Sequence, residues 1–164
     1  MADLNDLQKL LDRAAREIPE KALIAIEVEG KNFIQMNFEN EGFTDSVLEK
    51  WKERKTTDDQ GRDITRYRTN RRGKRGNLNK YGSGIQDRAL LTGLATGGNK
   101  LRNSIKSRVM KSSKQVRFYT SKEYADRHNE GLAGMPKRQF MGKSRYLDKQ
   151  IAKKITKELD KILK

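Results

Sequence analysis

The end of the sequence carries the pattern that most constrains the fold: a stripe of apolar residues that only a packed helix can bury. Its members recur at steps of four, four, four and three residues: Leu147, Ile151, Ile155, Leu159 and Ile162. That spacing places them on one face of an α-helix. Ser144 can cap the start of this helix, and the lysines near its end suit the helix dipole. The sequence therefore predicts a final amphipathic helix that packs on the rest of the fold.

The first segment repeats the pattern, with apolar residues at three- and four-residue steps: Leu4, Leu7, Leu11, Ala14 and Ile18. It predicts a second amphipathic helix. Pro19 either closes this helix or opens another one as a first-turn residue. Residues 20–40 fit a β-hairpin and a helix about equally well, and the residue pattern alone leaves both open.

A short helix is predicted after Thr44. Thr44, Asp45 and Ser46 can supply capping oxygens, and Val47, Leu48 and Trp51 would share one face of the helix. Trp51 is the only tryptophan in the chain, and we expect it to anchor the core.

The middle of the chain explains why the core must be small. Only 34% of all residues are hydrophobic while 36% are charged, against about 45–50% and about 25% in ordinary soluble domains. Residues 55–85 lack apolar periodicity, are interrupted by glycines and are strongly basic. We expect a single domain over residues 1–164 with 55–85 as a projecting basic loop, flexible unless bound to a partner. The cations expected to touch that partner are Arg66, Arg68, Arg71, Arg72, Lys74 and Arg75.

A small sheet is predicted in the second half. Residues 104–110 and 115–119 alternate polar and apolar side chains around a four-residue turn at 111–114, which is typical of a β-hairpin. A short helix is expected over 86–95, and another from Lys122 to Asn129, ended by Gly131. Residues 132–142 are expected to be irregular around Pro136. The predicted fold class is α+β, with N-terminal and C-terminal helices packed on a small antiparallel sheet and the basic loop inserted.

Little in the sequence points to catalysis. There is no cysteine and His128 is the only histidine, which excludes thiolate zinc sites and sites built on paired histidines. No phosphate-binding glycine motif is present. We therefore expect no enzymatic activity, no cofactor and no metal. No run of residues approaches the length of a membrane span, and the N-terminus does not resemble a secretory signal.

The charge distribution indicates the kind of partner. Residues 1–50 contain 6 basic and 11 acidic residues, whereas residues 51–164 contain 31 basic and 11 acidic residues. Such a field attracts nucleic acid or an acidic protein surface. The stretches Arg66-Tyr67-Arg68 and Arg117-Phe118-Tyr119 could stack on bases, although no recognised nucleic-acid-binding motif accompanies them.

Two short motifs carry a family resemblance. A strand at 116–119 is followed by Tyr124-Ala125, His128 and Gly131, and then by Pro136, Arg138, Phe140 and Gly142. This order is similar to the tailed-phage virion morphogenesis family, the tail-completion proteins of phages and Mu-like prophages. Upstream, Leu101, Ser104 and Ile105 resemble that family's entry into its first strand, and Trp51 resembles its tryptophan after the second helix. The chain departs from the family in its displaced Thr-Gly pairs, in Gln139 and in the long loop after Trp51.

The resemblance implies a function and a place. It implies a helix at 20–40 and a structural virion protein acting in tail completion or head–tail joining, as an oligomeric ring. Its partners would be tail-tube and neck or connector proteins, with non-specific contact with genomic DNA, and the ring would form in the host cytoplasm before residing in the virion. Arg138 is expected to reach a carboxylate of a neighbouring subunit, supplied by the acidic residues 1–50. The other motif residues have a plainer interpretation as turns and core packing, with His128 bonded to backbone. The alternative function is a basic nucleic-acid-binding module without catalytic activity.

Overall fold

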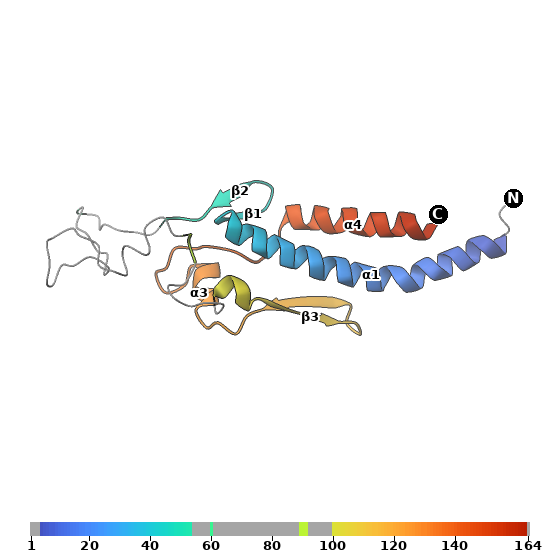
Figure 1. Cartoon of the computed structure of the whole chain (residues 1–164), viewed down its shortest axis with the longest axis horizontal. Coiled ribbons are helices and arrows are strands. Elements are labelled where there is room, and N and C mark those ends of the chain that lie inside the picture. Colours follow the sequence, from blue (N-terminus) through green and yellow to red (C-terminus); the bar gives the residue numbers. More distant parts are fainter. Residues whose placement is uncertain (1–3, 54–59, 61–88, 92–99, 164) are drawn as a thin grey trace.

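The computed structural model describes residues 4–53, 60, 89–91 and 100–163 (Figure 1). The elements are α1 (Leu4–Glu39), β1 (Gly42–Thr44), β2 (Leu48–Lys50), the 3-10 helix η1 (Leu101–Ser104), β3 (Lys106–Met110), β4 (Gln115–Tyr119), α3 (Ala125–Glu130) and α4 (Arg145–Leu163). The fold is α+β, as the sequence predicted. It contains two small antiparallel ribbons, β1–β2 and β3–β4, where one sheet was expected.

Helix α1 is one continuous element of 36 residues with Pro19 inside it. The prediction that Pro19 divides two helices is therefore wrong. The helix over residues 20–40, which the family resemblance implied, is confirmed. A proline removes one backbone hydrogen bond and bends a helix rather than always ending it, and α1 curves in its N-terminal half (Figure 1). Just beyond the proline, Leu23 is buried and Lys21 pairs with Glu158 of α4 at 3.4 Å, so packing carries the helix onward.

Helix α1 forms the middle of the fold, with α4 on one side and the β3–β4 ribbon on the other (Figure 1). Helix α4 runs antiparallel to α1, since Lys21 pairs with Glu158 and Glu29 with Lys154. The predicted cap is confirmed: the Oγ of Ser144 accepts a hydrogen bond from the backbone N–H of Leu147 at 3.1 Å.

The β3–β4 ribbon confirms the predicted hairpin and its turn at 111–114. It fits closely against α1 at Gly30, where an added Cβ would collide with the ring of Phe118. The hydroxyl of Ser107 donates to the carboxylate of Glu27. The hydrogen bond from Lys31, and secondly that from Ser107, lower the pKa of Glu27. The small residue at position 30 therefore lets the ribbon lie flat on the helix.

The prediction of a helix after Thr44 is wrong, because that segment forms the β1–β2 ribbon. The capping oxygens there act on another helix instead. The carboxylate of Asp45 accepts from the N–H of Arg145 at 2.7 Å, and its carbonyl accepts from the N–H of Tyr146 at 3.0 Å. The turn of β1–β2 thus caps α4, a hundred residues away in sequence. The short helix predicted over 86–95 lies mostly outside the described residues.

The core gathers at the C-terminal end of α1, where residues from several later segments of the chain join it. Its buried members are Ile34, Phe38, Trp51, Leu90, Leu101, Ala125 and Phe140. The ring of Phe38 meets Trp51 edge-on at 5.7 Å and Phe140 at 5.0 Å between centroids. Trp51 anchors the core as expected.

Candidate functional site: the anchored ends of the basic segment

The motif residues behind the family resemblance come together at this core. Leu101, Ala125 and Phe140 are buried, and Ile105 packs against them. The hydroxyl of Ser104 bonds to the Leu101 carbonyl at 2.7 Å and to the Thr120 hydroxyl at 2.6 Å. The structure therefore shows these residues joining elements within one chain.

The glycines and the proline of the motif lie in the irregular segment that follows α3. Gly131 ends α3 with a φ of +74°, a conformation that favours glycine. Pro136 is half-buried and Gly142 is exposed. The predicted irregular segment 132–142 is confirmed.

Two buried asparagines hold this segment in place, and the sequence analysis missed both. The Oδ1 of Asn129 accepts from the N–H groups of Phe140 and Met141, each at 3.0 Å. Asn37, fully buried in α1, donates to the Phe140 carbonyl at 3.2 Å and accepts from the N–H of Thr44 at 3.2 Å. The stretch 33–38 also contains the polar Gln35, so polarity in the sequence did not single out Asn37. The amides of Asn129 and Asn37 satisfy backbone groups that burial would otherwise leave unpaired.

Arg138 differs from the sequence expectation. Its side chain is 7% exposed, with Nε donating to the carbonyl of Lys52 at 2.9 Å and Nη2 to that of Glu53 at 3.1 Å. The backbone N–H of Arg138 donates to the backbone carbonyl of His128 at 2.7 Å. The guanidinium thus works as an internal clamp on the chain leaving β2, and not as the exposed group that a reach to a neighbouring subunit requires.

The clamp by Arg138 holds residue 53, just before the basic loop 55–85. Glu41 holds residue 90, just after that loop. Glu41 accepts at its carbonyl from the N–H of Trp51 at 2.7 Å, and at its carboxylate from the N–H of Leu90. Leu90 is buried in the core. Residues 53 and 90 are therefore held at the same end of the molecule. The projecting loop 55–85, apart from residue 60, lies outside the described residues, and so do the predicted contact residues Arg66, Arg68, Arg71, Arg72, Lys74 and Arg75.

His128 lies beside this clamp. Burial, and secondly the nearby charge of Arg138, lower its pKa, so it is neutral near pH 7. Its Nδ1 is buried without a hydrogen-bond partner in the described part of the chain. The ring meets Tyr124 edge-on at 6.0 Å between centroids, and Tyr124 is 42% exposed. Among the described residues, no carboxylate bonds to Nδ1 to orient this ring, as one does in a catalytic triad.

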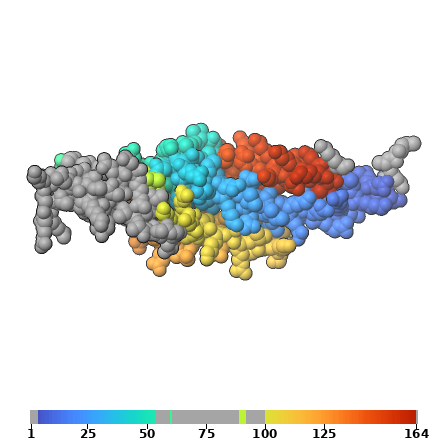
Figure 2. Space-filling model, in the orientation of Figure 1, coloured from blue at the N-terminus to red at the C-terminus, as the bar shows by residue number. Residues whose placement is uncertain are grey.

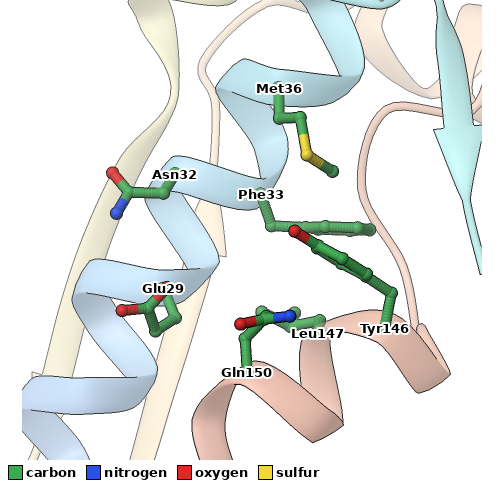
Figure 3. A pocket seen from close by; sticks show the side chains of 7 residues that line it. All are labelled: Glu29, Asn32, Phe33, Met36, Tyr146, Leu147 and Gln150. Atoms are coloured by element: carbon green, nitrogen blue, oxygen red, sulfur yellow. The ribbon is translucent and has the colours of Figure 1, made fainter. Parts of the chain in front are cut away.

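A shallow groove lies between α1 and α4 (Figure 3). The rings of Phe33 and Tyr146 stack in it at 6.3 Å between centroids, and its single carboxylate, Glu29, pairs with Lys154 at 3.3 Å. Within the described ranges, no group of three or more His, Cys, Asp or Glu residues could hold a metal ion. The side chains that line the groove are mainly apolar or amides, which suits packing between the two helices.

The far end of α1 forms a second notable surface, which we call the N-terminal arm (residues 4–18). It extends beyond the C-terminal end of α4 (Figures 1 and 2). Leu4, Leu7 and Leu11 are 82%, 52% and 51% exposed. The arm thus presents an apolar stripe that nothing in the described chain covers.

Comparison of the chain with protein-family models, curated proteins and solved structures found no match. A search of the described residues for a helix both long and apolar enough to cross a bilayer found none.

Proposed function

We propose that this chain is a structural phage virion protein, without enzymatic activity, that acts in tail completion or head–tail joining as an oligomeric ring. The sequence resemblance supplies the phage assignment. The observation that carries the assembly part is the exposed stripe of the N-terminal arm, because a ring requires each subunit to offer a surface that its own fold leaves uncovered.

The arm is suited to a protein partner. Its 15 residues span about 22 Å as a helix, and a helix of that length is marginal in water unless its apolar face is packed. Its charged residues are balanced and partly paired within the arm: Arg13 with Glu17 at 2.9 Å and Lys9 with Asp6 at 3.4 Å. What remains unmatched is the leucine stripe, so association through the arm would bury apolar surface.

A second copy of the chain is the partner that we propose for the arm. The arm itself is charge-balanced, but residues 19–50 retain an acidic excess that complements the basic excess of residues 51–164, so copies would attract one another in a head-to-tail arrangement while the arm supplies the apolar contact. Such a heterologous contact closes into a ring when its rotation divides a full turn. The predicted tail-tube and neck partners would then meet the completed ring.

The assembly part is tested by sedimentation velocity. We expect the wild-type chain to form a discrete oligomer and the variant Leu4→Ser/Leu7→Ser/Leu11→Ser to remain monomeric. The matched control is Val47→Ser/Leu132→Ser/Leu163→Ser, which removes three apolar side chains that are 74%, 52% and 44% exposed elsewhere. A wild-type monomer at all concentrations, or equal effects of the two variants, would contradict the arm as the interface.

The virion part is tested by electron microscopy of particles made by a phage genome that lacks this coding sequence. Over-long tails would support a terminator, and tails of normal length that stay detached would support a joining role. Intact infectious particles would overturn the proposed function.

A further inference from the structure

We propose that the outer face of the β3–β4 ribbon binds the phosphate backbone of double-stranded DNA without reading its sequence. This inference goes beyond the proposed function, and it applies to the monomer as well as to a ring. It assigns DNA contact to a named surface of the described chain, separate from the basic segment 55–85.

The ribbon has two chemically different faces. Ser107, Val109, Val116 and Phe118 are half-buried toward α1. Of their strand neighbours on the other face, Met110 is half-buried and the rest are exposed. The register pairs Lys106 with Tyr119, Arg108 with Arg117, and Met110 with Gln115 across the strands. The outer face is therefore a short ladder in which every pair but the last contains a cation.

The cations of this ladder have no neutralising partner in the chain as described. Arg108 lies directly opposite Arg117, and like charges in that position destabilise a ribbon. No carboxylate of the described residues pairs with Lys106, Arg108 or Arg117; of the turn lysines, Lys111 pairs with Glu20 at 3.0 Å. From residue 100 to residue 122 the sequence contains eight basic residues and no acidic one. A bound polyanion would relieve this repulsion.

The spacing of the ladder suits a nucleic-acid strand. Successive outward side chains of a strand are about 6.6–6.8 Å apart, and phosphates rise by about 3.4 Å each along one strand of B-DNA. Because the helical turn of the duplex also displaces successive phosphates sideways, neighbouring phosphates are about as far apart as these side chains, so side chains two residues apart on the ribbon can meet neighbouring phosphates. Tyr119, 40% exposed beside Lys106, adds a hydroxyl that can donate to a phosphate oxygen.

The composition of the face favours duplex DNA over an acidic protein or a single strand. Protein interfaces have an apolar core that is depleted of charged residues, whereas DNA interfaces are strongly positive. A single strand needs several stacking rings. Phe118, expected from the sequence to stack on bases, instead lies against Gly30 of α1, which leaves Tyr119 alone among the ribbon's rings on the outer face. The ribbon therefore offers charge in a regular array with little to stack on.

The test is fluorescence anisotropy of the full chain with a 20-base-pair duplex of mixed sequence, over 50–200 mM salt. The ribbon variant is Lys106→Gln/Arg108→Gln/Arg117→Gln. The matched control is Lys149→Gln/Lys153→Gln/Lys157→Gln, which removes three charges from exposed positions of α4. Both variants have the same net charge, so a difference between them isolates the surface.

We expect the ribbon variant to bind DNA at least tenfold more weakly than the control. The slope of log K against log salt should fall in magnitude by about two to three, since each lost phosphate contact removes about 0.9. The midpoint of urea unfolding should stay the same or rise, because the Arg108–Arg117 repulsion is removed. Equal binding by the two variants would overturn the proposal. It would also be overturned if the ribbon substitutions weakened binding to a polyglutamate peptide and left DNA binding unchanged.

Discussion

The two ends of α1 both carry apolar side chains on one helix face, but only the C-terminal end is buried by the rest of the chain. At the C-terminal end, aromatic rings and a buried amide of α1 pack on and bond to later parts of the chain. At the N-terminal end, the stripe of Leu4, Leu7 and Leu11 continues beyond α4 and stays exposed. The difference shows where the fold is complete in itself and where it offers a surface to another molecule. Each prediction below tests one side of that contrast.

Among the polar residues, the largest effect is expected at Asn129. Replacing it with alanine leaves the N–H groups of Phe140 and Met141 without their acceptor, and Phe140 is completely buried. Because an unpaired buried donor costs about 1–3 kcal/mol, Asn129→Ala should lower the free energy of unfolding by about 2–4 kcal/mol in urea titration. Asn32→Ala, at an exposed position of α1, is the control and should change it by less than about 0.5 kcal/mol. Equal losses of stability in the two variants would contradict the difference between the packed C-terminal end of α1 and its exposed positions.

Arg138 should show the next largest effect. Arg138→Met removes both donors to the carbonyls of Lys52 and Glu53, and hydrogen bonds from charged groups contribute about 1.5–3 kcal/mol. Arg138→Lys retains the charge but not the forked geometry, so it should lose most of the same stability. The two variants should differ at His128. The pKa of His128 should rise toward its ordinary value in Arg138→Met, and remain lowered in Arg138→Lys, as followed by NMR titration.

If both variants kept wild-type stability, the clamp would be contradicted, and the contact with a neighbouring subunit that the sequence suggested would regain support. A proteolysis assay at the exit from β2 adds a second measure, since loss of the clamp should increase cleavage after residue 53. If neither the cleavage nor the stability changed, Arg138 would not clamp the chain at the C-terminal end of α1.

How far the sequence could predict this structure depends on the range of each interaction. The stripe of α4 and its cap at Ser144 are local, and both were predicted correctly. The capping oxygens near Thr44 were recognised, but the helix that Asp45 caps begins a hundred residues later, and no local pattern shows that. Asn37 and Asn129 bond to backbone brought in by the tertiary fold, so their spacing could not distinguish them from solvent-facing residues. Arg138 was singled out as functional by resemblance, while its partners came from the far end of β2.

A smaller, pH-dependent effect is expected at His128. Its pKa is lowered in the folded chain by burial and by Arg138, so the unfolded chain binds the proton more readily. The stability that a neutral His128 contributes is therefore complete above pH 6.5 and declines as the pH falls below it. His128→Gln should lack this decline, which urea titrations at pH 7.5 and pH 5.5 would compare. Because His128 is the only histidine, its NMR signal also reports its pKa directly, and a value at or above 6.5 would contradict this account.

The smallest effect on the stability of the monomer is expected in the arm. Leu7→Ala removes an apolar side chain that is 52% exposed and should change the free energy of unfolding by less than about 0.5 kcal/mol. The matched change Leu23→Ala, on the same helix but at a residue that is 5% exposed, should cost about 2–5 kcal/mol. If the arm binds a second copy, the wild-type chain should also become more stable as its concentration rises, while Leu7→Ala should respond less, because association stabilises only the folded state. A cost at Leu7 comparable with that at Leu23 in dilute protein would mean that the arm is packed within its own chain, and the two ends of α1 would then serve the same purpose.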